Sequence, residues 1–210
     1  MGALLVFLFQ ATAISLSGVM APGPMTAAAI AGGARRKHAG ALMGLGHGMV
    51  EFPLMVGIMA GMGVLLRSET AKTGIGLAGG VFLMLMGAGM LWKLRGPETE
   101  VRVSGRGGPI VVGVALSAGN PFFLIWWATI GLTLVTKAME LSVWALVLFG
   151  IIHWLCDLVW LEALSVASFR GGRLLGGRSR RVVPAICALV LLAFGVIYLY
   201  DAGRALAALR

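Results

Sequence analysis

Residues 39–66 read AGALMGLGHGMVEFPLMVGIMAGMGVLL, a run of 28 residues in which His47 and Glu51 are the only ionisable side chains. A membrane-spanning helix needs about 20 apolar residues, so this run is long enough to cross a bilayer. The whole chain has the same character: 59% of its 210 residues are hydrophobic, 12% are charged, and the mean hydropathy is +0.96. A soluble domain would carry about 25% charged residues, and a disordered chain would be far less hydrophobic. The composition therefore indicates an integral membrane protein.

Five further apolar runs of similar length complete the predicted membrane domain. The six predicted spans are Ala3–Ile30, Ala39–Leu66, Thr73–Leu94, Pro109–Thr136, Leu141–Phe169 and Val182–Leu206. The polar tract 95–108 separates residues 1–94 from residues 109–210, with three spans in each half. Because each half has an odd number of spans, the second half enters the membrane upside down relative to the first. We therefore predict an all-α protein built from two inverted three-helix repeats, a plan common among secondary transporters.

The distribution of basic residues predicts the orientation in the membrane. Twelve of the 17 Lys and Arg residues lie in the tracts that follow the first, third and fifth spans, counting Lys93 at the end of the third span. The positive-inside rule places these tracts, including the loop 95–108, in the cytoplasm and both termini outside the cell membrane. The same placement between apolar runs argues against nucleic-acid binding, despite a net charge of +9. No basic region precedes the first apolar run, so we expect no cleavable signal peptide.

Two spans contain matching proline motifs. The first motif is Pro22, Gly23 and Pro24, and the second is Gly119, Asn120 and Pro121. Proline removes a backbone donor and clashes with the preceding turn, so we expect the first and fourth helices to be broken there. The half-helices that follow would point free N–H groups into the protein, where they attract anionic groups such as a substrate carboxylate. The alternative is a pair of structural kinks, which membrane helices tolerate.

Two histidine–acid pairs also match between the halves. His47 precedes Glu51 by four residues, and His153 precedes Asp157 by four, so each pair lies on one helix face. Ionisable groups at mid-membrane are costly unless they face protein or water and find partners. Such groups are suited to taking up and releasing protons or to binding a substrate amine, because histidine titrates near neutral pH. Alternatively, each histidine only satisfies its neighbouring carboxylate. We expect Glu162, nearer the end of its span, to be solvated or paired.

A divalent metal ion is the second ligand that these pairs suggest. Two imidazoles and two carboxylates suit zinc, nickel, iron or manganese. Such a site requires His47, Glu51, His153 and Asp157 to reach within about 2.0–2.2 Å of one shared point.

Small and aromatic residues complete the set of candidates. Gly40, Gly44 and Gly48 are spaced four apart, a pattern that lets another helix approach closely. We expect tight packing within one chain, with a homodimer interface as the alternative. Trp126 and Trp127 follow the second motif, where they would form either a pocket wall or part of the membrane interface.

Several of these motifs together resemble the lysine-exporter type (LysE/RhtB) family of amino-acid exporters. The resemblance rests on Pro22-Gly23-Pro24, the basic loop Arg35-Arg36-Lys37, the glycine stripe, and Asn120-Pro121. It implies export of amino acids or related small solutes, driven by the proton gradient. The chain departs from the family pattern at Met25, where members often have asparagine, and in its two histidine–acid pairs.

The function predicted from the sequence is therefore a secondary transporter that exports a small metabolite, an amino acid or derivative, by proton antiport. The partners would be the solute, protons and lipid. A divalent-metal exporter is the alternative. We expect neither an enzyme nor a bound cofactor, since no nucleophile triad or phosphate loop is visible. A thiol relay would need paired cysteines beside the prolines, whereas Cys156 and Cys187 lie in the fifth and sixth spans.

Overall fold

The computed structural model of the chain describes residues 2–21, 23–62, 68–94, 108–175 and 179–208, and every regular element in these ranges is a helix. The all-α class predicted from the composition is therefore confirmed. Two elements, η1 and η2, are short π-helical segments that continue α3 and α7. In chain order the elements are α1 (Gly2–Val19), α2 (Pro24–Gly33), α3 (Ala39–Gly57), η1 (Ile58–Met62), α5 (Glu69–Leu94), α6 (Gly108–Ala118), α7 (Pro121–Trp126), η2 (Trp127–Gly131), α8 (Leu132–Leu141), α9 (Val143–Leu175) and α10 (Ser179–Ala208).

Six helical segments among the described residues are long and apolar enough to cross a membrane, as predicted. They are Gly2–Val19, Ala39–Gly61, Glu69–Trp92, Pro121–Leu141, Val143–Gly171 and Ala185–Ala207. Their outer surface is apolar: Phe9 is 78% exposed and Trp92 81% exposed, whereas Ser15 and Glu51 are fully buried. This arrangement is the reverse of that in a soluble protein and suits a lipid environment.

The first predicted span, residues 3–30, is divided into two helices. α1 ends at Val19, and α2 begins at Pro24 after an extended Gly23 (φ −162°, ψ −178°). Proline fits the first position of a helix because the N–H that it lacks would have no partner there. α2 has only 10 residues, so α1 alone is the spanning candidate in this region. Pro22, the first proline of the motif, lies outside the described residues.

The fourth predicted span, residues 109–136, is divided in the same way but with the long part second. α6 ends at Ala118 and α7 begins at Pro121, with Asn120 extended between them (φ −98°, ψ 102°). The Asn120 side chain caps the new helix by accepting a hydrogen bond from the Phe122 N–H (3.1 Å). The spanning segment here therefore follows the proline motif rather than preceding it.

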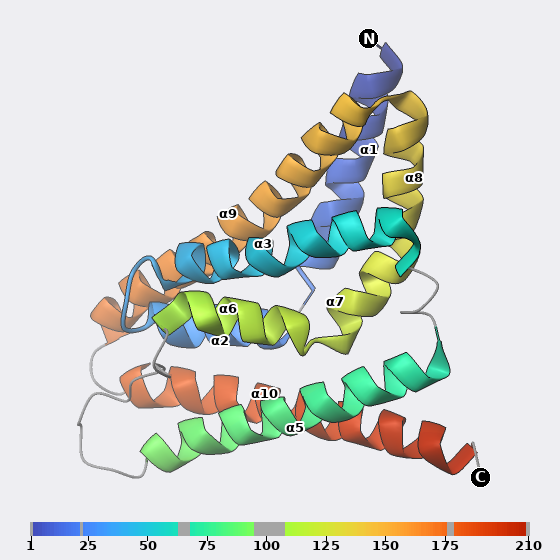
Figure 1. Ribbon diagram of the computed structural model, residues 1–210. Helices are drawn as coiled ribbons and strands as arrows, with labels where there is room; N and C mark the ends of the chain where they lie inside the picture. The colour runs from blue at the N-terminus through green and yellow to red at the C-terminus, as the bar shows by residue number, and fades with distance from the viewer. Residues whose placement is uncertain (1, 22, 63–67, 95–107, 176–178, 209–210) are drawn as a thin grey trace.

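The helices of the two halves interlock. Figure 1 shows α5 and α10 crossing side by side along one edge of the molecule, with α2 and α6 next to them and α3 and α9 beyond. α3 packs against both α6 and α9, while α1 and α2 also pack on α9. Each of these contacts, like that between α5 and α10, joins a helix of residues 1–94 to a helix of residues 108–210.

The glycine stripe on α3 brings that helix close to α9. A Cβ on Gly40 would collide with the backbone of Leu161, and a Cβ on Gly44 would lie 3.0 Å from the Leu158 Cα. The Trp154 indole N–H donates to the Gly44 carbonyl at 2.9 Å. The stripe therefore packs within the chain, as expected, and it sets how closely the side chains of α3 and α9 approach each other.

Candidate functional site

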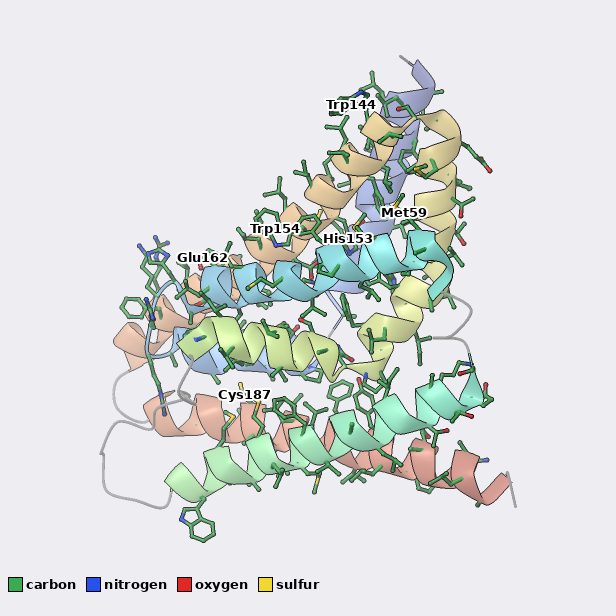
Figure 2. All side chains as sticks on the ribbon, viewed as in Figure 1. Met59, Trp144, His153, Trp154, Glu162 and Cys187 are labelled. Carbon is green, nitrogen blue, oxygen red and sulfur yellow. The ribbon has the colours of Figure 1, made fainter. Side chains whose placement is uncertain are left out.

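The two histidine–acid pairs meet in one cluster. His47 and Glu51 lie on α3, His153 and Asp157 lie on α9, and we call these residues the four-residue cluster. The side chains are largely buried, with 7%, 0%, 5% and 15% exposed, respectively. In Figure 2, His153 lies near the centre of the molecule, between Trp144 at the start of α9 and Glu162 farther along the same helix. The cluster is therefore in the interior, away from both helix ends.

The contacts between the helices are as close as those within each helix. His153 Nε2 lies 3.0 Å from Glu51 Oε1, and His47 Nε2 lies 3.8 Å from Asp157 Oδ2. The two pairs within a helix are 3.8 Å and 3.7 Å apart. Each histidine therefore faces both carboxylates. The alternative, in which each histidine contacts only the carboxylate of its own helix, does not describe this geometry.

Two buried serines fix how the histidine rings are oriented. The Ser117 hydroxyl donates to the Gly113 carbonyl at 2.7 Å, so its oxygen is left to accept from His47 Nδ1 at 2.7 Å. In the same way, Ser15 donates to the carbonyl four residues before it and accepts from His153 Nδ1, both at 2.7 Å. With Nδ1 carrying the hydrogen, Nε2 of each neutral ring presents a lone pair to the carboxylates.

The serines are the site residues that sequence reasoning missed. Ser15 lies on α1 and Ser117 on α6, each in the opposite half of the chain from the histidine that it contacts. A serine inside an apolar helix commonly bonds its own i−4 carbonyl and needs no further partner. The sequence therefore carried no signal that separated these two serines from the others.

Three atoms of the cluster make no hydrogen bond although they are buried: both carboxylate oxygens of Glu51 and Nε2 of His47. Buried polar groups are nearly always hydrogen-bonded, because an unpaired group in a low-dielectric interior is costly. Glu51 is fully buried. An arrangement of this kind can accept a positively charged or hydrogen-bond-donating group at its centre.

Aromatic rings enclose the two imidazoles. Trp126 stacks on His153 with ring centroids 4.9 Å apart and an interplanar angle of 24°, and Trp127 meets the same ring edge-on at 5.1 Å. Phe123 packs edge-on against His47 at 4.8 Å. Trp127 is fully buried, whereas Trp126 is partly exposed. These rings limit the access of solvent to the imidazoles.

A cavity of about 260 Å³ connects the cluster with both proline motifs. This volume is slightly below the usual range for sites of drug-sized ligands, about 300–1,000 Å³, and suits a small solute. Of the predicted residues, those lining it are Gly23, Pro24, His47, Asn120, Trp126, Trp127, His153 and Asp157. Glu51, Gly119 and Pro121 are not part of the lining. Gly119 and Pro121 are instead covered by α5: a Cβ on Gly79 would collide with the Gly119 carbonyl and lie 3.2 Å from the Pro121 Cδ.

The two helix starts at the cavity differ in their polar contacts. At the second motif, Asn120 Oδ1 accepts from the Phe122 N–H at 3.1 Å and from the Tyr198 hydroxyl at 3.0 Å. At the first motif, Gly23 provides no side-chain cap for α2. The first N–H groups of a helix have no partner within it. The start of α2 therefore offers free backbone N–H groups to the cavity. At the start of α7, by contrast, Asn120 already accepts a hydrogen bond from the Phe122 N–H.

Other candidates from the sequence lie apart from the cluster. Glu162 pairs with His38 and accepts a hydrogen bond from the Ala41 N–H at 3.0 Å, so it is a paired residue, as expected. Cys156 and Cys187 are both free thiols.

One comparison with known proteins gives a match. A family model described as LysE type translocator matches residues 16–202. No curated protein and no solved structure matches the chain. The matched range contains both proline motifs and all four residues of the cluster.

Proposed function

This chain belongs to the LysE type translocator family, and we propose that it exports a small, positively charged or zwitterionic solute, an amino acid or derivative, in exchange for protons. Membership of the family supports transport of a small molecule across a membrane. The nature of the solute and the use of protons are our proposal. The observation that carries it is one cavity lined both by an uncapped helix start and by carboxylate and imidazole groups.

The polarity of the cavity matches the two ends of an amino acid. Met25 and Thr26, in the first turn of α2, line it together with Asp157. A helix N-terminus attracts anionic groups through its free N–H groups and its dipole. A substrate carboxylate would bind there, and its ammonium group would bind toward Asp157 and Glu51.

Proton coupling would follow from competition at the same carboxylates. A protonated Asp157 or Glu51 has no negative charge with which to hold an ammonium group, so binding of a proton and binding of the solute would exclude each other. Protons entering from the outer face would release the solute, and loss of protons toward the cytoplasm would restore the site. His47 and His153 would assist by exchanging protons with the carboxylates that they contact.

We further propose that the two halves are inverted repeats that rock about the cluster. The pattern of contacts supports this: α3 packs on α6 as α9 packs on α1, and each histidine is held by a serine of the other half. A movement of one half relative to the other would therefore change the cluster directly. The cytoplasmic position of residues 95–108 remains a prediction from the charge distribution, and these residues, apart from Gly108, lie outside the described ranges.

The test is efflux from preloaded proteoliposomes with an imposed pH gradient, with amino acids as cargo. We expect gradient-driven efflux for the wild type and its loss in Asp157→Asn and Glu51→Gln. Glu162→Gln is the matched control, because it removes a carboxylate from the same helix as Asp157 but away from the cavity. Efflux that is unaffected by both cluster variants would contradict the proposal.

Divalent metal ions are the second candidate cargo. Ligand atoms of His47, Glu51 and Asp157 all lie within 4.8 Å of one another, which favours a single cation at their centre. The same vesicles loaded with Zn²⁺ or Mn²⁺ distinguish the two cargoes. Metal efflux without amino-acid efflux would favour the second candidate over the first.

A further inference from the structure

We infer that the four-residue cluster is a binding site for one divalent ion of the first transition series, with His47 Nε2, His153 Nε2, Glu51 and Asp157 as ligands and Ser15 and Ser117 as positioning residues. The inference concerns binding at equilibrium. It does not depend on whether the exported solute is an amino acid.

The spacing of the donor atoms fits a small ion. Four tetrahedral ligands at about 2.0–2.1 Å from zinc lie about 3.3 Å from one another. The imidazole–carboxylate separations in the cluster are 3.0 Å, 3.7 Å, 3.8 Å and 3.8 Å. Ligand atoms of His47, Glu51 and Asp157 lie within 4.8 Å of one another, and His153 Nε2 contacts both carboxylates. Binding one ion would draw these atoms closer together. The sequence alone could not show whether the ligand atoms approach one shared point, and in the structure they lie close together.

The unpaired atoms point to a ligand independently of the spacing. Both oxygens of Glu51 and the Nε2 atom of His47 are buried without a hydrogen bond. A carboxylate oxygen and an imidazole nitrogen are the donors that a divalent cation takes. An ion at the centre would satisfy all three atoms together, and its charge of +2 would balance the two ionised carboxylates.

The serines supply the outer-shell contacts that metal-binding histidines usually have. A ligating histidine almost always donates its second ring N–H to an oxygen, which fixes the tautomer and aims the other nitrogen at the metal. Ser117 accepts from His47 Nδ1 and Ser15 accepts from His153 Nδ1, both at 2.7 Å. Because each hydroxyl hydrogen is already given to a backbone carbonyl, the serine oxygens are committed to this accepting role.

The donor set selects the class of metal. Imidazole suits zinc, nickel and iron, and carboxylate oxygen suits harder ions such as manganese. Two of each favour Zn²⁺, Co²⁺, Ni²⁺, Fe²⁺ or Mn²⁺ over Ca²⁺, which prefers six to eight oxygen ligands. The two imidazole nitrogens also disfavour Mg²⁺, which binds through carboxylate and phosphate oxygens and retained water molecules.

Titration of the purified full-length protein with Co²⁺ tests this inference, because Co²⁺ in a nitrogen and oxygen site of low coordination number gives an intense visible absorption. We expect a band that saturates at one Co²⁺ per chain and is removed by Zn²⁺ in competition. We expect Glu51→Gln and His153→Gln to abolish the band. His38→Gln should leave it intact, since His38 pairs with Glu162 outside the cluster.

The positioning role has its own readout. We expect Ser117→Ala and Ser15→Ala to bind Co²⁺ about 10–100-fold more weakly, the loss typical of removing an outer-shell partner. Ser165→Ala is the matched control, because Ser165 is also a fully buried serine, on α9, but bonds the Lys37 carbonyl. If Ser117→Ala and Ser165→Ala bind Co²⁺ equally well, the positioning role is wrong.

The ion's role is assigned by two further arms. If vesicles release Zn²⁺ in a way that depends on His153, the ion is a cargo. If Zn²⁺ inhibits amino-acid efflux in the wild type but not in His153→Gln, the ion is a ligand that competes for the site. Either result supports the site. No saturable Co²⁺ band in wild-type protein that eluted as a single folded species would overturn it. Amino-acid efflux measured in the presence of a chelator then tests the proposed function separately.

Discussion

The substitution Gly40→Ala is expected to separate α3 from α9 and thereby to disable the cluster. A Cβ at this position would collide with the carbonyl group of Leu161 and would lie 2.8 Å from the Glu162 backbone nitrogen, whereas ordinary contacts begin at 3.4 Å. The obstacle is backbone, which cannot rotate away as a flexible side chain can. The helices must therefore move apart by at least about 1 Å to relieve this overlap.

That movement has a calculable effect on the cluster. The closest contact between the two helices there is the 3.0 Å separation of His153 Nε2 and Glu51 Oε1, which would lengthen toward about 4 Å. A misplacement of about 1 Å can reduce activity by about 100-fold. Overpacking costs typically about 1–3 kcal/mol of stability, so a folded but inactive protein is the expected result.

The assay compares proton-driven efflux and the thermal unfolding midpoint of Gly40→Ala and Gly74→Ala. Gly74 is the matched control, since a Cβ there meets nothing within 4 Å. We expect Gly74→Ala to transport like the wild type and Gly40→Ala to lose at least about 10-fold of its efflux rate. Wild-type efflux in Gly40→Ala would refute the reasoning that close helix contact positions the cluster.

Three further substitutions probe the surroundings of the cluster. Tyr198→Phe removes the hydrogen bond to Asn120 Oδ1 and should cost about 1 kcal/mol, seen as a several-fold higher KM for efflux with little change in maximal rate. Trp126→Leu removes the ring stacked on His153. It should weaken solute binding and reduce the change in tryptophan fluorescence that accompanies binding. An unchanged fluorescence signal would exclude Trp126 from the site. Glu162→Gln disrupts an ion pair with the exposed His38 and should change the unfolding free energy by no more than about 1 kcal/mol, measured by chemical denaturation.

Much of the fold could be predicted because the membrane imposes simple rules. Runs of about 20 apolar residues indicate spanning helices with little ambiguity. The proline motifs led us to expect a break in the first and fourth spans, and in the structure each of these spans is divided there into separate helices. Pattern alone could not indicate that the spanning part precedes Pro24 in one half and follows Pro121 in the other.

The candidate site was predictable in part. A spacing of four residues places His47 beside Glu51 and His153 beside Asp157 on one face of each helix. Spacing within a helix does not determine which faces of two helices meet. The glycines at 40 and 44 carried part of that information, because they lie on the face of α3 that contacts α9.

The serines illustrate what a single sequence does not reveal. Ser15 is separated from its histidine by 138 residues and Ser117 from its histidine by 70. Both contacts cross between the two halves of the chain, and only the packing of the helices brings them together.

The central claim, that residues from both halves form one site, is tested most directly by a double-mutant cycle between Glu51→Gln and Asp157→Asn. The measurement is the affinity for the exported solute, or for Co²⁺, in the wild type, both single variants and the double variant. Residues that share one ligand show interaction free energies of about 0.5–3 kcal/mol. The double variant should therefore bind the ligand almost as well as the single variant with the lower affinity. Losses that add within about 0.5 kcal/mol would mean that the two carboxylates act independently, and the claim of a single shared site would be wrong.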